Sequence, residues 1–230
     1  MYILIYLIFF LLFNYIVSLM IKPPQKYINY KKIRSLYFNL YEIPLSHKKD
    51  FSLEHVVPQS TFDRNSTLKN DMHNILLYPA KINLHRSNYK YVSDSLLYPN
   101  SKLFNIIGEQ IKYEYPIHNF DISVKNNKHK TFYPIDKYKG AIARSSMYFV
   151  SLYPFYKDVI FNKIIDPYTI LFWHHEYMID DFECKKNKLI KNLQGNDNIY
   201  ISEPKQLVFD MEKILGEKLD TFKDFNHKKN

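Results

Sequence analysis

The first 21 residues of the chain, MYILIYLIFFLLFNYIVSLMI, contain no charged residue. A run of about 20 apolar residues is long enough to cross a bilayer as a helix. It also lacks the polar face that a surface helix of a soluble domain would show. We therefore interpret residues 1–21 as a signal-anchor or a secretory signal peptide. No basic residue precedes the run and no A-x-A-like cleavage site follows it, so the sequence leaves both alternatives open.

Residues 22–230 are long enough for one domain with a sizeable core. The composition is that of a globular protein, with 46% apolar residues, 21 Tyr and 17 Phe. The one cysteine, Cys184, allows no internal disulfide, so an exported form would have to be stable without one. We predict a single domain over residues 22–230. It would act as a monomer, either exported or held at a membrane only by residues 1–21.

The formal net charge of +9 is unevenly distributed. Residues 22–154 carry 20 Lys and Arg against 10 Asp and Glu, whereas residues 155–230 carry 12 against 13. A basic region suits a polyanionic partner such as nucleic acid or an anionic membrane surface. The abundance of Lys, Asn, Ile and Tyr is also typical of A/T-rich coding, so charge alone does not identify the partner. In this Lys-rich background the four arginines are candidates for bidentate phosphate binding.

The patterns along the chain predict a helix-rich α+β fold with a small β element near its front. Residues 51–91 read as strand, loop, strand and helix, with Pro58 and Pro79 ending the two strands and with the helix in AKINLHRSNYKYV. The stretch 92–135 is mixed, with a candidate strand in YPIHNFDISV. Apolar periodicity predicts further helices over residues 25–41, 138–153, 167–175, 180–194 and 203–219.

Glu54 and His55 lie side by side in the first predicted strand, FSLEHVVPQS. A carboxylate is a hard ligand for Mg²⁺ or Ca²⁺, and a neutral histidine can act as a general base near pH 7. Neighbouring side chains of a regular strand point to opposite faces, so a shared site would need a twist or bulge near Pro58. Taken alone, the two residues are explained as well by a surface ion pair.

Asn83 and Arg86 are the second candidate pair. Three residues apart on the predicted helix, they share one face. An amide oxygen is a hard neutral metal ligand, and a guanidinium clamps phosphate. Taken alone, these too are ordinary polar residues of a helix.

The combined segments EHVVPQS and DMHNILLYPAKINLHRSN resemble the core of the bacterial endonuclease I family. Members are secreted or periplasmic nucleases with a His-Me finger, also called the ββα-metal motif. KGAIARSSMYF resembles the family's K/R-G-x-I-A-R segment, and ILFWHHEYMIDDFECKKNKLIKNLQGNDN resembles its tryptophan, E-x-x-R-N-x-x-I and Q-G-N-x-N run. The matches keep the family's order from about residue 51 to 201. Rare residues of this chain fall on them: Arg86, Gly140, Arg144, Trp173 and Gly195.

The resemblance implies a role for each candidate. His55 would be the general base, and Glu54 and Asn83 would hold Mg²⁺, with Ca²⁺ or Mn²⁺ as other metals for the site. Arg86 would order the site or contact phosphate. Arg64, in the loop after the first strand, would match a family arginine that contacts phosphate.

Two other positions carry expectations from the resemblance. His73 would be structural rather than a metal ligand. Lys186 stands where the family has Arg, and QGNDNIY replaces QGNRNPF. These changes bear on stability and on the grip on substrate more than on the catalytic step.

The resemblance therefore implies a Mg²⁺-dependent, non-specific endonuclease that hydrolyses phosphodiester bonds in DNA and, as a further substrate, RNA. The alternatives are a ribonuclease of the same family and a membrane-anchored nucleic-acid-binding protein without catalysis. WHHEY offers no zinc motif, because Ile179 stands where H-E-x-x-H needs its second histidine.

Overall fold

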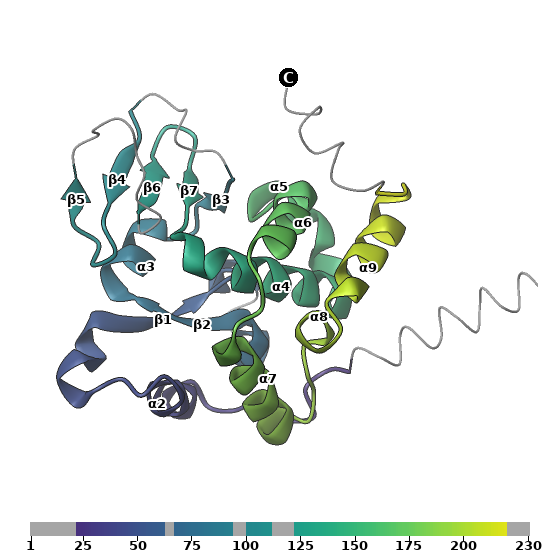
Figure 1. Ribbon diagram of the computed structural model, residues 1–230, viewed down its shortest axis with the longest axis horizontal. Helices are drawn as coiled ribbons and strands as arrows, with labels where there is room; N and C mark the ends of the chain where they lie inside the picture. The colour runs from purple at the N-terminus through teal and green to yellow at the C-terminus, as the bar shows by residue number, and fades with distance from the viewer. Residues whose placement is uncertain (1–21, 63–66, 94–99, 112–121, 220–230) are drawn as a thin grey trace, which may run out of the picture.

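A computed structural model describes residues 22–62, 67–93, 100–111 and 122–219, and it shows a mixture of helices and strands (Figure 1). The predicted α+β class is confirmed. The strands are β1 (Phe51–His55), β2 (Ile75–Pro79), β3 (Lys90–Tyr91), β4 (Lys102–Phe104), β5 (Gln110–Ile111), β6 (Ser123–Asn126) and β7 (Thr131–Tyr133). The helices are α2 (Tyr30–Leu40), α3 (Ala80–Arg86), α4 (Asp136–Leu152), α5 (Lys157–Lys163), α6 (Pro167–Glu176), α7 (Asp181–Gln194), α8 (Ile199–Ser202) and α9 (Lys205–Leu215). Short 3-10 turns are η1 (Leu45–Asp50), η2 (Gln59–Thr61), η3 (Thr67–Asn70), η4 (Met72–Asn74) and η6 (Pro154–Tyr156).

β1 and β2 form an antiparallel pair whose register runs unbroken from Phe51 opposite Pro79 to His55 opposite Ile75. No bulge interrupts β1 as far as His55, because each strand residue keeps its partner and side chains alternate regularly. One face packs on α2, and the other packs toward α3 and α4. The first face carries Leu53, Ile75 and Leu77, and the second carries Leu76 and Tyr78.

α2 and α3 thus cover opposite faces of the β1–β2 pair, as Figure 1 shows. The helix predicted over residues 80–92 ends at Arg86, because Ser87 adopts a φ of 55° and leaves the helical path. The chain then enters β3, where Lys90 pairs with Thr131. The order strand, strand, helix over residues 51–86 is as predicted.

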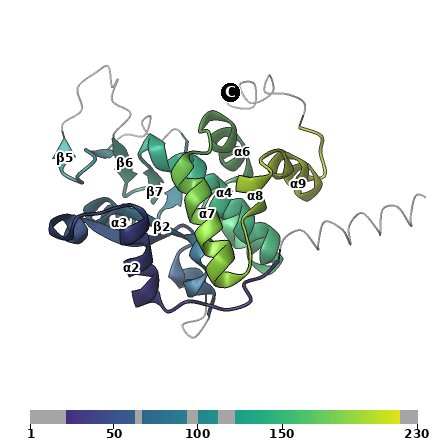
Figure 2. The same ribbon diagram turned by 60° about the horizontal axis from the view of Figure 1, so that its bottom comes forward.

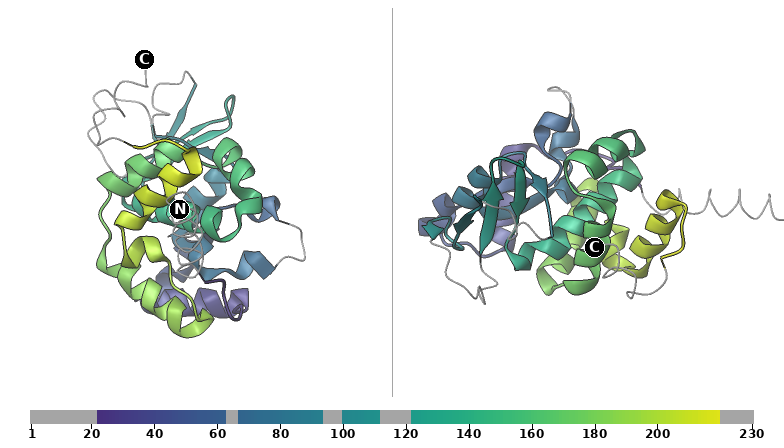
Figure 3. Two further views of the ribbon diagram at one scale, coloured as in Figure 1. Left: turned by 90° about the vertical axis from the view of Figure 1, so that its right-hand side faces the viewer. Right: turned by 90° about the horizontal axis from the view of Figure 1, so that it is seen from above.

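The second sheet has the strand order β3-β7-β6-β4-β5. It lies at one end of the molecule and α9 lies at the other, whereas the chain that follows α5 reaches the sheet, where Tyr91 of β3 forms a bridge with Ile165 (Figures 1 and 3). Of the candidate strand in YPIHNFDISV, residues 115–121 lie outside the described residues, and Ser123 and Val124 begin β6.

The helices around α4 form the larger core. α4 runs through the middle of the molecule, with α6 packed along it and α7 nearby (Figure 2). α7 has the predicted ends: Asp180 accepts a hydrogen bond from the Glu183 N–H, and Gly195 follows with a φ of 80°.

Within the parts of the chain that the structure describes, no helix combines the length and apolar character needed to cross a membrane. The leader proposed for residues 1–21 lies outside those parts.

Candidate active site

Glu54 is a buried carboxylate at the centre of a polar cluster between β1 and α3. Its Oε1 accepts hydrogen bonds from Arg86 Nη1 and from the Tyr91 hydroxyl, both at 2.8 Å. Burial raises the pKa of Glu54, and the Arg86 guanidinium and these two hydrogen bonds oppose that rise. Among the described residues no hydrogen bond is made to Oε2, so this oxygen is the one left for a ligand.

Asn83 and Arg86 join α3 to the open edge of β1. Asn83 Nδ2 donates to the Leu53 carbonyl at 3.2 Å and to the Ser52 hydroxyl at 2.9 Å. Arg86 Nη1 also donates to the His55 carbonyl at 3.0 Å. In an antiparallel pair every second residue turns its carbonyl away from the partner strand. Leu53 and His55 are two such residues of β1, and α3 binds both of their carbonyls.

These contacts place three of the predicted site residues together. Asn83 and Arg86 are neighbours on one face of α3, and Glu54 is bound directly to Arg86. Because both N–H bonds of Asn83 go to β1, its Oδ1 faces away from the strand and carries no hydrogen bond within the described residues.

His55 lies on the opposite face of β1, toward α2. Its Nε2 lies 2.8 Å from the Lys69 carbonyl oxygen, which can only accept, so Nε2 carries the proton. The neutral ring then has an unprotonated Nδ1, and the exposed amide of Gln59 donates to it at 3.1 Å. Burial lowers the pKa of His55, which favours this neutral form.

Glu54 and His55 make no hydrogen bond to each other, as the alternation of β1 requires. The two faces of the strand nevertheless interact through their charges. Arg86 contributes to lowering the pKa of His55, and Glu54 contributes to raising the pKa of Tyr30, the residue stacked on His55. At the end of β1, the charges around Glu54 on one face therefore influence the protonation of His55 and Tyr30 on the other face.

The chain just after His55 is held by side chains. The amide of Asn74 bonds to both backbone groups of Val57, at 2.8 and 2.9 Å, and Arg86 Nη2 donates to the Val56 carbonyl at 2.9 Å. The loop that follows strand β1 therefore leaves it in one fixed direction.

Arg64, the predicted phosphate contact, lies outside the described residues. The contacts of Arg86 favour one of its two predicted roles, since its Nη atoms bind Glu54 and backbone carbonyls and the side chain is buried. These contacts match the expectation that Arg86 would order the site rather than the expectation that it would contact phosphate.

Tyr30, Gln59 and Tyr91 contact the candidate residues but were not predicted from the sequence. Gln59 stands in the same stretch as His55, four residues on, which is a usable local signal. Tyr30 and Tyr91 reach the site only through tertiary packing.

The η4 turn lies behind the site and has a buried polar network of its own. Asp71 accepts hydrogen bonds from the Tyr148 and Tyr153 hydroxyls, each at 3.0 Å. His73 Nε2 bonds to the Asn196 carbonyl at 3.3 Å, and burial lowers the pKa of this histidine to about 3. Its contacts are those of a structural residue. Lys186 is buried nearby, with its pKa lowered to about 8.

The downstream motifs form the frame of the molecule. Arg144 binds both carboxylate oxygens of Glu183 and the Tyr177 carbonyl. Gly140 is required by this arrangement, because a Cβ there would lie 2.4 Å from Arg144 Nη2 and 2.7 Å from the Tyr177 oxygen. Gln194 Oε1 accepts from the Met72 N–H, which ties the Q-G-N-x-N run to η4.

The two histidines of the WHHEY stretch contact other groups of the protein. His174 Nε2 bonds to the Pro204 carbonyl, and His175 contacts Glu176 at the surface. Across the described ranges, no group of three or more His, Cys, Asp and Glu side chains is placed to hold a metal ion.

Comparison with known proteins gives a match to the family model described as Endonuclease I over residues 43–205. The matched region contains Glu54, His55, Asn83 and Arg86. The chain belongs to the endonuclease I family. The order of motifs predicted from the sequence is thus explained by common descent.

Two relatives of this family come from Buchnera aphidicola, and both are called Endonuclease-1. The protein of subspecies Baizongia pistaciae is 30% identical over 134 residues, which cover 58% of this chain and 46% of that protein. The protein of subspecies Acyrthosiphon pisum is 27% identical over 191 residues, covering 74% of this chain and 68% of that protein. The chain therefore spans about half of the first relative and about two thirds of the second.

Proposed function

We propose that this protein is a metal-dependent endonuclease that hydrolyses phosphodiester bonds without sequence specificity, with DNA as its main substrate. The observation that carries the proposal is the state of His55. The Lys69 carbonyl holds a proton on Nε2 and burial favours the neutral ring, so the imidazole offers Nδ1 as a base one residue after the carboxylate of Glu54. Membership of the endonuclease I family supports the same reaction.

His55 would take the proton of the attacking water at Nδ1. As that proton moves, the water oxygen forms a bond to phosphorus, the bond from phosphorus to the 3′-oxygen breaks, and the leaving oxygen takes a proton from solvent. The Lys69 carbonyl stabilises the resulting imidazolium, because the Nε2–H bond strengthens as the ring becomes charged. The exposed Gln59 amide marks the place where the water would bind.

Glu54 and Asn83 fit a divalent metal ion of the Mg²⁺ type. Each has one oxygen without a hydrogen bond from the described residues, and each is held in place through its other polar atom. Two hard oxygen ligands are enough, because Mg²⁺ keeps several waters and completes its shell with substrate phosphate. When bound, the metal supplies positive charge for the oxygens of the scissile phosphate.

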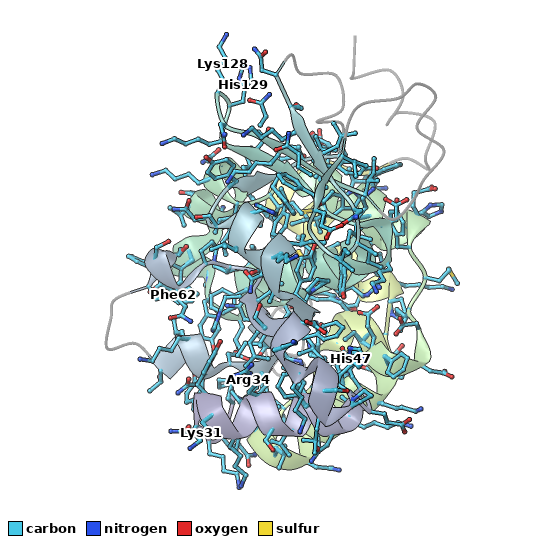
Figure 4. The ribbon with its side chains drawn as sticks, turned by 90° about the vertical axis from the view of Figure 1, so that its left-hand side faces the viewer. Lys31, Arg34, His47, Phe62, Lys128 and His129 are labelled. Atoms are coloured by element: carbon cyan, nitrogen blue, oxygen red, sulfur yellow. The ribbon has the colours of Figure 1, made fainter. Side chains whose placement is uncertain are left out.

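The surface near His55 is basic. α2 begins at Tyr30 and carries Lys31, Lys32 and Arg34 with no acidic residue. Figure 4 shows Lys31 and Arg34 on this helix, with His47 of η1 on the same face of the molecule. Lys128 and His129 lie at the opposite end of that face. Such side chains bind phosphates of any sequence, so binding should weaken strongly with salt.

Nicking of supercoiled plasmid DNA by the full-length protein tests the proposal. We expect relaxation and linearisation in Mg²⁺, and none in EDTA. His55→Ala should lower the rate by about 10²- to 10⁴-fold, the usual contribution of a general base, and leave DNA binding at low salt unchanged.

The matched control is His175→Ala, because His175 is an exposed histidine on α6 outside the site. It should cleave like the wild type. Equal cleavage by wild type and His55→Ala would reject the assignment. Binding without cleavage in every metal tested would favour the non-catalytic nucleic-acid-binding protein, and preference for RNA would favour the ribonuclease.

A further inference from the structure

The ring of Tyr30 stacks on the imidazole of His55. The ring centroids are 5.8 Å apart and the planes differ by 9°, an offset parallel arrangement. The hydrogen bond from Nε2 to Lys69 fixes one edge of the imidazole, but an edge contact alone leaves the ring free to tilt about that bond. A flat side chain against the face of the imidazole removes that freedom.

The position of Tyr30 is itself fixed by the fold. Tyr30 is the first residue of α2, and Asn29 caps the helix by accepting from the Lys31 N–H at 2.9 Å. Further along, Ile33 is buried, and the Tyr37 hydroxyl donates to the Met72 carbonyl at 2.7 Å. α2 is therefore anchored to η4, the turn that also holds the backbone after His55.

Core packing does not account for Tyr30. It is 39% exposed, whereas Ile33 and Tyr37 of the same helix are fully buried. Its described ring contact is with His55 alone, and α2 lies before residue 43, where the match to the family model begins. The contact therefore comes from the part of this chain outside the matched region.

We propose that Tyr30 is a positioning residue for the reaction, whose ring holds the plane of the His55 imidazole so that Nδ1 faces the attacking water. The effect of Tyr30 on catalysis rests on the proposed function. The restraint that Tyr30 places on the His55 ring does not depend on that function. The phenol hydroxyl has no part in this role, so a planar ring without it should serve equally well.

The test compares full-length Tyr30→Phe and Tyr30→Leu with wild type in plasmid nicking with Mg²⁺. Tyr30→Leu should lower kcat by about 10- to 100-fold, as expected when a reacting group is misaligned, with KM unchanged. Tyr30→Phe should stay within about twofold of wild type, because the stack is kept. Tyr168→Leu is the matched control, since Tyr168 is 38% exposed and lies on α6, and it should behave like wild type.

A second measurement needs no activity. In the metal-free protein, ¹H–¹⁵N NMR spectra of the imidazoles report the tautomer and mobility of each histidine, and His55→Gln identifies the His55 signals. Wild type and Tyr30→Phe should show one sharp Nε2–H tautomer. Tyr30→Leu should keep the Nε2–H tautomer, which the Lys69 carbonyl fixes, but its His55 signals should broaden because the ring is free to tilt.

The outcomes are distinct. Wild-type kcat in Tyr30→Leu, or unchanged His55 signals in that variant, would overturn the proposal while leaving the nuclease function intact. A raised KM with unchanged kcat would also overturn it, because Tyr30 would then bind substrate by stacking on a base. If the wild type itself does not cleave, the proposed function fails, and the NMR comparison still decides whether Tyr30 restrains the ring.

Discussion

Arg86 connects the parts of the candidate site. Its two Nη atoms bind the Glu54 carboxylate and the carbonyls of His55 and Val56, so one planar group fixes a side chain and the backbone at the end of β1. Its guanidinium also lies 4.3 Å from the centre of the Tyr91 ring, whose hydroxyl shares Glu54 Oε1. Removing the cation would leave a buried carboxylate without its charged partner.

We therefore expect Arg86→Met to lower the free energy of unfolding by about 3–5 kcal/mol, the usual cost of breaking a buried ion pair. Arg86→Lys should lose less, because it keeps the charge but cannot span three acceptors with one ammonium group. Urea unfolding monitored by circular dichroism measures both. Arg34→Met on the exposed side of α2 is the control. If Arg86→Met had the same free energy of unfolding as Arg34→Met, the contacts of Arg86 with Glu54 and the end of β1 would not stabilise the fold as we expect.

At the scale of single residues, the sequence predicted which residues group around β1 and α3, but it did not predict all of their binding partners. Of the residues predicted to share a site, Glu54 and Arg86 form an ion pair, and Asn83 binds β1 at Ser52 and Leu53. The sequence also suggested phosphate for the rare arginines, whereas Arg86 and Arg144 bind internal carboxylates. A planar fork fits both kinds of anion, so residue type alone cannot distinguish them.

Among the elements, η4 is the point where the helices meet the strand pair. Met72 bonds to Tyr37 of α2 and to Gln194 of α7, the Ser145 hydroxyl of α4 donates to the His73 carbonyl, and Asn74 holds Val57 after β1. A three-residue turn thus connects three helices, α2, α4 and α7, to the chain that follows β1.

The network behind η4 responds to pH in two opposite ways. Burial raises the pKa of Asp71 to about 6, so between about pH 4 and 6 the folded state holds a proton that the unfolded state has lost. Burial lowers the pKa of His73 to about 3, so over the same range the unfolded state holds the extra proton. As pH rises, Asp71 lowers the free energy of unfolding and His73 raises it, and the two effects nearly cancel.

Substituting His73→Gln should remove one of these effects. Relative to wild type, the free energy of unfolding of the variant should then fall as pH rises from 4 to 6, by at most about 1.4 kcal/mol per pH unit. Urea unfolding at pH 4, 5 and 6 measures the slopes. Parallel slopes for His73→Gln and wild type would refute the assignment.

Elements with strong local signals were predicted well, and those made by long-range pairing were not. α7 has an apolar stripe, a capping Asp180 and a terminal Gly195, and all three act locally. The five-stranded sheet consists of strands of two to four residues, too short to show an alternating pattern. Its pairing depends on contacts between distant segments, such as Lys90 with Thr131.

Across the whole molecule, the charge asymmetry and the position of the site agree. The basic part of the sequence, residues 22–154, contains β1, α3 and α2, which carry all the described candidate residues and Tyr30. The C-terminal helices, with a balanced charge, supply the frame through Glu183, which binds Arg144 of α4, and through Gln194, which binds Met72 of η4. In the proposed function, residues 22–154 would attract the nucleic acid, and the C-terminal helices would support the site through their contacts with α4 and η4.

The measurement that tests the central claim most directly is the single-turnover rate of DNA cleavage as a function of Mg²⁺ concentration. For wild type we predict a rate that saturates. His55→Ala should saturate at the same Mg²⁺ concentration with a plateau about 10²- to 10⁴-fold lower, whereas Asn83→Ala should need more Mg²⁺. A His55→Ala plateau equal to that of wild type, or an Asn83→Ala curve that coincides with wild type, would contradict the account.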